Sequence, residues 1–261
     1  MDTVLLKHLS EASRNGDINE LQLLMANEPS LLDRFVDDAP EGEEHDNPLH
    51  IAASCGHVDF TIELLQLKPQ LAQMRNRQGR LPLHFAAASG HLQVMEKLIN
   101  QQHDKTLYLS PDSKYGYMPA HMAAINGEYT TMKMLIEKCR DVLDKTTRAK
   151  ETLMHLAVIA NCLDSVRYLI NLGVNPNEED VDRNTCLHLA CQNRNHHDVI
   201  TYLLDHKDVE VNSTNASGLT PLDIILMSSS DSATDASLVR LLRRAGGEGA
   251  IQRDGRLFFG I

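Results

Sequence analysis

The sequence predicts an all-α fold made of a repeated pair of short helices. Two observations carry this prediction. A string close to Pro-Leu-His-x-Ala-Ala recurs, placing His50, His84, His121, His155 and His188 at intervals of 33 to 37 residues, a period typical of stacked repeats. In addition, only 4% of the 261 residues are aromatic and none is Trp, although 42% are hydrophobic. Small and aliphatic residues in thin layers suit this composition better than one large core.

The first helix of each unit is expected to begin at the proline of the string. Proline is favoured in the first helical turn, because its fixed φ suits a helix and its missing N–H would have no partner there. The alanines let neighbouring helices approach closely. The helix is expected to end about six residues after the histidine, at residues that tolerate a left-handed conformation. These residues are Gly56, Gly90, Gly127 and Asn161.

The second helix of each unit is expected to carry an aliphatic pair fourteen residues after the histidine. In the sixth unit the pair Leu203-Leu204 falls one residue later, which places an insertion near Arg194-Asn195. A turn then leads to the next unit, with glycine five residues before the histidine position at 79, 116 and 218. His45, Lys150 and Arg183 hold that place elsewhere, so those turns are expected to be adapted or looser. The aliphatic pairs of the other units are Leu64-Leu65, Leu98-Ile99, Leu135-Ile136 and Leu169-Ile170.

These strings resemble the ankyrin repeat family, whose hallmark is Thr-Pro-Leu-His-x-Ala-Ala at about 33 residues. The resemblance covers roughly residues 47–246, and 5–24 resembles a degenerate first unit. It implies an all-α solenoid of about seven stacked helix pairs with short β-turn fingers. We expect a capping repeat and acidic loop start at 1–40, the repeat stack at 41–246 and a flexible tail at 247–261. The departures are Asn47, Leu81 and Met118 in place of Thr, and Leu153 and Cys186 in place of Pro.

A narrower resemblance is to plant ankyrin proteins whose repeats precede a four-helix membrane domain. It rests on Gly56-His57-Val58-Asp59-Phe60, on Leu67-Lys68-Pro69-Gln70-Leu71-Ala72 and on a Ser/Asp-rich stretch at 228–237. The membrane domain is absent from this sequence. The resemblance implies a role in defence or stress signalling, in the cytoplasm or at the cytoplasmic face of the plasma membrane.

Composition and charge narrow the classes of function. The net charge of −11 argues against a nucleic-acid binder that works through backbone electrostatics. No apolar stretch approaches the roughly 20 residues that a membrane-spanning helix needs. The N-terminus lacks a basic region ahead of an apolar one, so a secretory signal is not predicted. Five scattered cysteines do not resemble a disulfide framework and suit a reducing cytosol.

The residues that could form a catalytic or metal site also have structural interpretations. For the five repeat histidines, the ankyrin resemblance implies rings that hydrogen-bond neighbouring turns. Cys186-x-His188-x-x-Cys191 suggests a metal cluster, but a closed zinc site needs four converging ligands, and Cys191 replaces a buried alanine. No phosphate loop or nucleophile motif is present. The sequence therefore predicts no enzyme, no cofactor and no metal.

Two charged segments lie outside the repeat pattern. An acidic run at 37–46 is interpreted as a solvated loop or as a lip that attracts a basic partner. Arginines at 240, 243, 244, 253 and 256 make the C-terminal stretch locally basic, which suggests contact with anionic lipid as an alternative to a frayed end. The acids are Asp37, Asp38, Glu41, Glu43, Glu44 and Asp46.

Partner-binding residues follow from the ankyrin resemblance, which implies contacts beside the turn position and after the alanine pair. We expect Arg77, Arg80, Tyr115 and Tyr117 to be central, since Tyr and Arg dominate interface energies. The expected function is a monomeric scaffold or adaptor that binds proteins through its concave face and turn tips. The alternative is a regulatory or targeting domain of a longer membrane-anchored or enzyme-containing protein. The full predicted set is Arg77, Gln78, Arg80, Lys114, Tyr115, Tyr117, Arg148 and Glu151.

Overall fold

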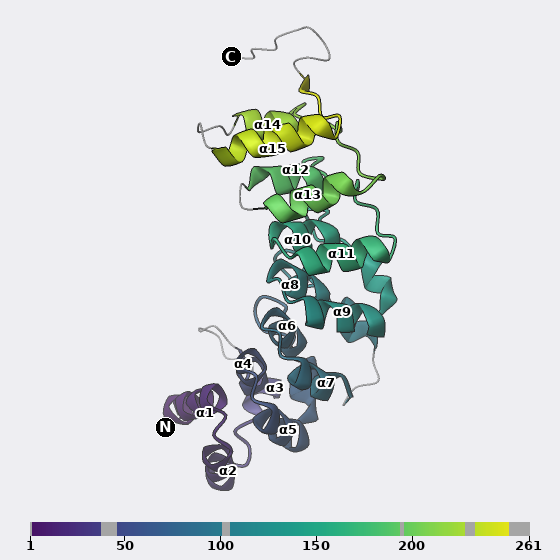
Figure 1. Cartoon of the computed structure of the whole chain (residues 1–261). Helices are drawn as coiled ribbons and strands as arrows, with labels where there is room; N and C mark the ends of the chain where they lie inside the picture. Colours follow the sequence, from purple (N-terminus) through teal and green to yellow (C-terminus); the bar gives the residue numbers. More distant parts are fainter. Residues whose placement is uncertain (1, 38–45, 101–104, 194–195, 228–232, 251–261) are drawn as a thin grey trace. The chain divides into compact units, whose positions relative to one another are not determined.

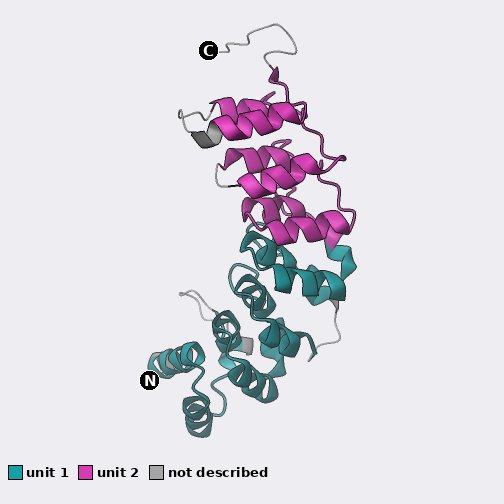
Figure 2. Cartoon of the chain, in the orientation of Figure 1, with its two compact units in different colours: residues 1–142 teal, residues 143–261 magenta. Residues whose placement is uncertain are grey.

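The computed structural model describes residues 2–37, 46–100, 105–193, 196–227 and 233–250. The chain divides into two compact units, residues 1–142 and residues 143–261, which are coloured separately in Figure 2. The predicted insertion near Arg194-Asn195 and most of the acidic run at 37–46 lie outside the described residues.

Unit 1 holds four helix pairs whose first helices lie in a row. The row runs α1, α4, α6, α8, with each helix in contact with the next, and the second helices α5 and α7 also contact each other (Figure 1). The pairs are α1 (Asp2–Asn15) with α2 (Ile18–Asn27), α4 (Pro48–Cys55) with α5 (Val58–Leu67), α6 (Pro82–Ala88) with α7 (Leu92–Asn100) and α8 (Pro119–Ile125) with α9 (Tyr129–Lys138). A short helical segment follows each pair: α3 (Arg34–Asp37), η1 (Pro69–Gln73), η2 (Lys105–Leu109) and η3 (Arg140–Asp144), the last of which extends past the end of unit 1.

Unit 2 has the same internal arrangement, with three helix pairs. Its first helices α10, α12 and α14 again lie in a row, in contact with their neighbours. The described ranges thus contain the expected seven helix pairs and no strand, which confirms the predicted fold class. None of the described helices is long and apolar enough to cross a membrane. The pairs are α10 (Leu153–Ile159) with α11 (Leu163–Asn171), α12 (Cys186–Gln192) with α13 (His197–Asp205), and α14 (Pro221–Met227) with α15 (Ala233–Arg244).

The core is a series of thin aliphatic layers, as the low aromatic content indicated. Phe60 is the largest fully buried side chain, and most of the others are Leu or Met. The alanine pairs Ala52-Ala53 and Ala86-Ala87 are fully buried where α4 contacts α6. Each buried Leu contributes about 1.5 to 3 kcal/mol, so the layers together provide the main favourable term in folding.

Left-handed residues end the helices and shape the turns where the sequence predicts them. Gly56, Gly90 and Gly127 have positive φ, and Asn161 follows α10 at φ 53°. Lys150 and Arg183 stand in the glycine place of their turns with φ of 58° and 59°. Their amides still close the turns, donating to the carbonyls of Thr147 and Asp180 at 3.0 Å. These turns are therefore adapted to a side chain rather than loosened.

Part of the predicted flexible tail is bonded to unit 2. The amide of Glu248 donates to Oδ1 of Asn212 at 2.8 Å, and the amide of Ala250 donates to Oδ2 of Asp223 at 2.9 Å. Residues 251–261 lie outside the described residues. The ordered fold therefore extends at least to residue 250.

Candidate partner-binding surface

Each repeat from the third onward begins with a turn that we call its finger. In unit 1 the third finger is 76–80 and the fourth is 112–117; in unit 2 the fifth, sixth and seventh are 147–151, 180–184 and 215–219. A backbone hydrogen bond closes each finger base, such as the bond from the amide of Asn76 to the carbonyl of Arg80 at 2.9 Å. The fourth finger closes from Asp112 to Tyr117 and is one residue longer than the others.

Four of the repeat histidines join a first helix to a finger of the next repeat. His50 Nε2 lies 2.9 Å from the carbonyl oxygen of Arg80, and His84 Nε2 lies 3.1 Å from that of Tyr117. In unit 2, His155 and His188 reach the carbonyls of Asn184 and Leu219 at 3.1 Å. A carbonyl only accepts, so Nε2 carries the proton and donates in these four bonds.

The other ring nitrogen anchors the start of the same helix. Nδ1 accepts the amide of the residue three positions earlier at 3.0 to 3.2 Å in His50, His84, His121, His155 and His188. This bond also forms where Leu81 and Met118 replace the usual capping side chain. Burial lowers the pKa of His84 to about 4, against weaker opposing effects of its backbone hydrogen bonds. Its ring is therefore neutral near pH 7, as this bonding pattern requires.

The seventh repeat has Asp223 in the histidine place, so a group that only accepts hydrogen bonds replaces the histidine ring, which both accepts and donates. Oδ2 of Asp223 accepts from the amide and hydroxyl of Thr220 at 2.9 and 2.8 Å, which replaces the Nδ1 contact. The same oxygen accepts the amide of Ala250, where a histidine would donate to a carbonyl. The ladder of histidine donors in unit 2 thus ends on an acceptor.

Arg80 and Asp112 form a largely buried ion pair between the third and fourth fingers. The guanidinium Nε and one Nη lie 3.1 Å from Oδ2 of Asp112, whose side chain is fully buried. Burial alone would raise the pKa of this carboxyl. The amides of Tyr115 and Tyr117 and the Arg80 guanidinium outweigh burial and hold the pKa below its usual value. Arg80, predicted as a partner contact, therefore has a structural contact of its own, and its binding role stays a prediction.

The fourth finger presents an exposed aromatic cluster. The rings of Tyr115 and Tyr117 stack with centroids 5.3 Å apart, and Nζ of Lys114 lies 4.6 Å from the centroid of Tyr115. Tyr115 is 44% exposed, whereas Tyr117 is half-buried. The amide of Ser113 donates to the carbonyl of Gln78 at 2.7 Å and ties this finger to the third. The structure thus brings the predicted residues Arg77, Gln78, Lys114 and Tyr115 onto neighbouring finger tips, all exposed.

In unit 2 the predicted residues Arg148 and Glu151 share the fifth finger. Arg148 is exposed, but Glu151 is half-buried and accepts the hydroxyl of Thr147 at 2.9 Å. The structure adds Val181, which is 56% exposed at the tip of the sixth finger. Its amide donates to the carbonyl of Ala149 at 2.8 Å. Val181 stands two residues before the turn position, so extending the same positional rule to the sixth unit would have found it.

Asp112 is the residue of the surface that the sequence analysis missed. Its Oδ1 accepts the amides of Tyr115, Gly116 and Tyr117 at 2.8, 2.8 and 3.2 Å, and so fixes the backbone of the fourth finger. An aspartate four residues before a turn glycine is the signal that points to this role, because its short side chain bonds nearby backbone amides.

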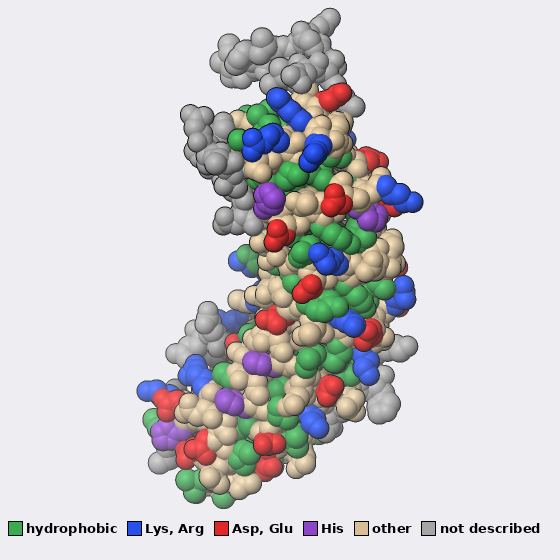
Figure 3. All heavy atoms as spheres, viewed as in Figure 1, with side chains coloured by type: hydrophobic (Ala, Val, Ile, Leu, Met, Phe, Trp, Pro, Cys, Tyr) green, Lys and Arg blue, Asp and Glu red, His purple; other side chains and the backbone are tan. Residues whose placement is uncertain are grey.

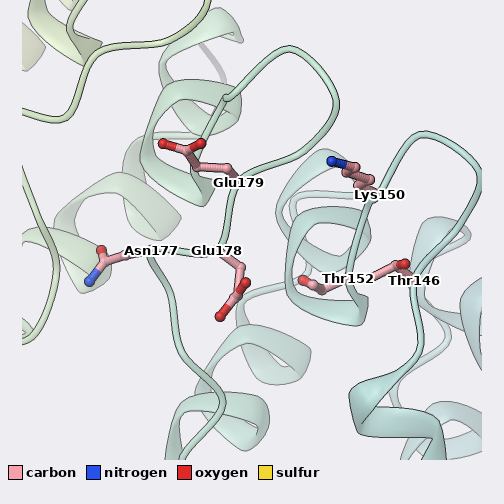
Figure 4. Close-up of a pocket in the computed structure, with 6 residues that line it drawn as sticks. All are labelled: Thr146, Lys150, Thr152, Asn177, Glu178 and Glu179. Atoms are coloured by element: carbon pink, nitrogen blue, oxygen red, sulfur yellow. The ribbon is translucent and has the colours of Figure 1, made fainter.

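A hollow of about 540 Å³ opens in unit 2 beside the fifth finger (Figure 4). Glu178 and Glu179 lie on one side of it. The other side is formed by residues in or beside the fifth finger, Thr146, Lys150 and Thr152. Both acids have partners already: Oε1 of Glu178 accepts from Asn175 at 3.0 Å, and Glu179 pairs with Arg183 at 3.1 Å. The side chains that line the hollow are therefore polar, and both glutamates already have partners within the chain.

The other chemical candidates have structural partners. Both ring nitrogens of His188 are occupied, and burial raises the pKa of the Cys186 and Cys191 thiols, which keeps them protonated. Among the described residues, no group of His, Cys, Asp or Glu is placed to hold a metal ion. Lys and Arg side chains gather over α15 (Figure 3), where Arg243 and Arg244 occupy the last turn. The carbonyls at a helix end favour such cations, which accounts for this cluster.

Comparison with known proteins identifies the repeat and places the chain among longer relatives. A family model of ankyrin repeats (three copies) matches residues 9–108, 105–180 and 172–246. Mouse Rabankyrin-5 is 27% identical over 45% of this chain, and chicken nuclear factor NF-kappa-B p105 subunit is 27% identical over 71%. Human transient receptor potential cation channel subfamily A member 1 is 33% identical over 32% of the chain. The chain spans 10%, 19% and 7% of these relatives, respectively.

A solved structure supports the same fold. The ankyrin repeat domain of human ASB11 matches with a TM-score of 0.69 over 89% of this chain and 96% of that one, at 23% identity. At this identity the likeness concerns the fold alone. Together with the helix pairs, the histidine ladder and the family model matched along residues 9–246, it shows that the chain belongs to the ankyrin repeat family.

Proposed function

We propose that this chain is a monomeric, non-enzymatic scaffold or adaptor that binds partner proteins through its finger tips. Ankyrin repeats are protein-interaction modules, and the family model covers most of the chain. The observation that carries the proposal is that the groups that hold the fingers in place differ from the side chains exposed at their tips. Backbone bonds and buried histidines hold the fingers in place, and side chains such as Arg77, Tyr115 and Val181 are exposed at their tips.

The narrower biological proposal is plant defence or stress signalling, in the cytoplasm or at the cytoplasmic face of the plasma membrane. Its support is the resemblance of residues 56–60 and 67–72 to plant ankyrin proteins that carry a membrane domain. The five free cysteines accord with a reducing compartment. Localisation of the tagged chain in plant cells, with and without membrane fractionation, tests this narrower proposal.

A second candidate function is that the repeats regulate or target an activity within a longer protein. One observation favours it: the matched segments are a small part of each relative, and one relative is a cation channel by name. The two candidates differ in whether the partner lies in the same chain. Sequencing the full transcript separates them.

Affinity capture from plant cytosol tests the adaptor proposal. The variant Arg77→Ala/Lys114→Ala/Tyr115→Ala removes exposed finger side chains and leaves the Arg80–Asp112 ion pair intact. The control Lys97→Ala/Lys138→Ala/Gln93→Ala alters exposed positions on α7 and α9. We expect specific partners to be lost from the finger variant and retained by the control, with unchanged helical circular dichroism in both. The same partner list for all three proteins would refute binding through these fingers.

A further inference from the structure

The third and fourth fingers, with the arginine before them, carry four basic side chains and one acidic side chain. A second acid, Asp46, accepts a hydrogen bond from Nδ2 of Asn76 in the third finger at 2.7 Å. Arg75, Arg77 and Lys114 are exposed, and none of them forms an ion pair with a described carboxylate. The one acid within these fingers, Asp112, is buried and already paired with Arg80. The third finger and the arginine just before it contain no acid at all. This local excess stands on a chain whose net charge is −11.

An aromatic face lies within the same surface. Tyr115 is 44% exposed and stacks on Tyr117, while Nζ of Lys114 lies over its ring, 4.6 Å from the centroid. Aromatic faces of this kind offer large contact area at a low cost in side-chain entropy. We call Arg75, Arg77, Lys114 and Tyr115 the basic finger surface.

The backbone beneath the basic finger surface is held in place before any partner arrives. Asp112 Oδ1 binds three successive amides of the fourth finger, and Ser113 joins that finger to Gln78. Nη1 of Arg75 donates to the carbonyls of Gly79 and Pro111 at 2.6 and 2.9 Å, which bridges the two fingers from the other side. A preformed surface loses little conformational entropy on binding, so its contacts translate more fully into affinity.

We propose that the basic finger surface binds an acidic peptide segment of a partner protein. Carboxylates of that segment pair with Arg77 and Lys114, and a planar side chain packs on Tyr115. Arginine and lysine across from carboxylates also speed association and exclude basic competitors. Nucleic acid fits the surface less well, because a chain with this net charge repels an extended polyanion and only three cations are available. The proposal rests on the adaptor function and specifies the chemistry of its partner.

The test uses a fluorescent synthetic peptide of Asp and Glu residues around one Phe, titrated by anisotropy with the full chain. A second peptide carries Asn and Gln in place of the acids, and a third probe is a labelled single-stranded RNA. The variant Arg77→Ala/Lys114→Ala is compared with Lys97→Ala/Lys138→Ala, which removes the same formal charge from α7 and α9 of unit 1. Tyr115→Ala is measured separately.

We expect the acidic peptide to bind at least about tenfold more weakly to Arg77→Ala/Lys114→Ala and within about twofold of wild type to the lysine control. Tyr115→Ala should weaken binding of the same peptide several-fold, as expected for loss of an aromatic anchor. Equal loss in both charge variants, equal binding of the amide peptide, or tighter binding of the RNA would overturn the proposal. If partner capture still depends on the fingers while the acidic peptide does not bind, the adaptor function stands and this inference alone fails.

Discussion

The fingers of the two units use different chemistry to meet the same structural demand. Between the third and fourth fingers of unit 1, the contact is a charged pair, Arg80 with the buried Asp112. Between the sixth and seventh fingers of unit 2, the equivalent contact joins two amides, Nδ2 of Asn215 to Oδ1 of Asn184 at 3.0 Å. The histidine-to-carbonyl bond is common to both. The fold thus requires that bond and some polar partner at the finger base, but it does not prescribe the charge.

The side chains at the finger tips also differ in charge between the two units. Unit 1 offers arginines, a lysine and stacked tyrosines, whereas the sixth finger of unit 2 offers Val181 and Asp182 beside Glu178 and Glu179. A common framework with independent tips is what a modular binding surface needs, since recognition changes without loss of the helical layers. Four measurements test this comparison.

Removal of the charged contact should cost far more than removal of the amide contact. Asp112→Ala leaves Arg80 without its partner and three finger amides without an acceptor, so we expect a loss of about 3 to 5 kcal/mol in the free energy of unfolding. Asn215→Ala should cost about 1 to 2 kcal/mol, because neutral hydrogen bonds are lost. Urea denaturation of both variants measures the difference. Equal losses would mean that the ion pair contributes no more than an amide bond.

Acid should weaken the hydrogen bonds of the buried repeat histidines in both units. The pKa of His84 falls from 6.5 to about 4, and burial also lowers the pKa of His50, His155 and His188. The unfolded chain therefore binds protons first, and stability is lost as pH falls from 6.5 towards 4, by about 3 kcal/mol from His84 alone. Urea midpoints across this range should fall steeply for wild type and less steeply for His84→Gln. Parallel curves would exclude His84 as a source of the pH dependence.

Because the third finger lies close to the fourth, substitution of two equivalent turn glycines should cost different amounts of stability. Gly79 and Gly218 both have positive φ, but a Cβ on Gly79 would also lie 2.8 Å from the amide nitrogen of Ser113, whereas Gly218 has no such neighbour. We expect Gly79→Ala to cost about 2 to 3 kcal/mol and Gly218→Ala about 1 to 2 kcal/mol, from strain alone in the second case. Thermal unfolding monitored by circular dichroism gives both values. A larger loss for Gly218→Ala would contradict the close approach of the third and fourth fingers.

The smallest expected effect is a gain in stability. Lys150 adopts φ of 58° without the freedom of glycine, so Lys150→Gly should relieve strain and stabilise the chain by up to about 1 kcal/mol, less the entropy that glycine loses on folding. Lys150→Ala is the matched control, because it removes the same side chain and keeps the Cβ. If both variants are equally stable, left-handed strain is not stored at this turn.

The sequence predicts the fold well because its signal is repeated. Five histidines, the alanine pairs and the left-handed residues specify helix starts and ends in every unit, and tertiary contacts in the structure agree with them. Lys150 and Arg183 show the limit of that approach: the sequence places them at turn positions but cannot reveal that the turns tolerate them with closed hydrogen bonds.

The positions of the exposed finger residues could be predicted from the sequence, but their contacts could not. The repeat register places Arg77 and Arg80 on one finger, yet only coordinates show that Arg77 is exposed while Arg80 is paired with a buried acid. That pair joins residues 32 positions apart. The repeat register gives the spacing of such finger contacts, as in the pair Asn184–Asn215, but not which side chains occupy them or how deeply they are buried, and so the partner of Arg80 was missed.

The carboxylate of Asp223 has a consequence for enlarging the array by repeat duplication. Suppose that a copied repeat is inserted between α11 and α12. His155 of the preceding repeat would donate to a carbonyl of the inserted finger, and the inserted histidine would donate to the finger that follows. A copy placed directly after α15 would meet Asp223, which accepts an amide but has no proton to give to a finger carbonyl. Insertion of consensus repeats should therefore succeed within the histidine-bearing part of unit 2 and, after α15, should also require Asp223→His.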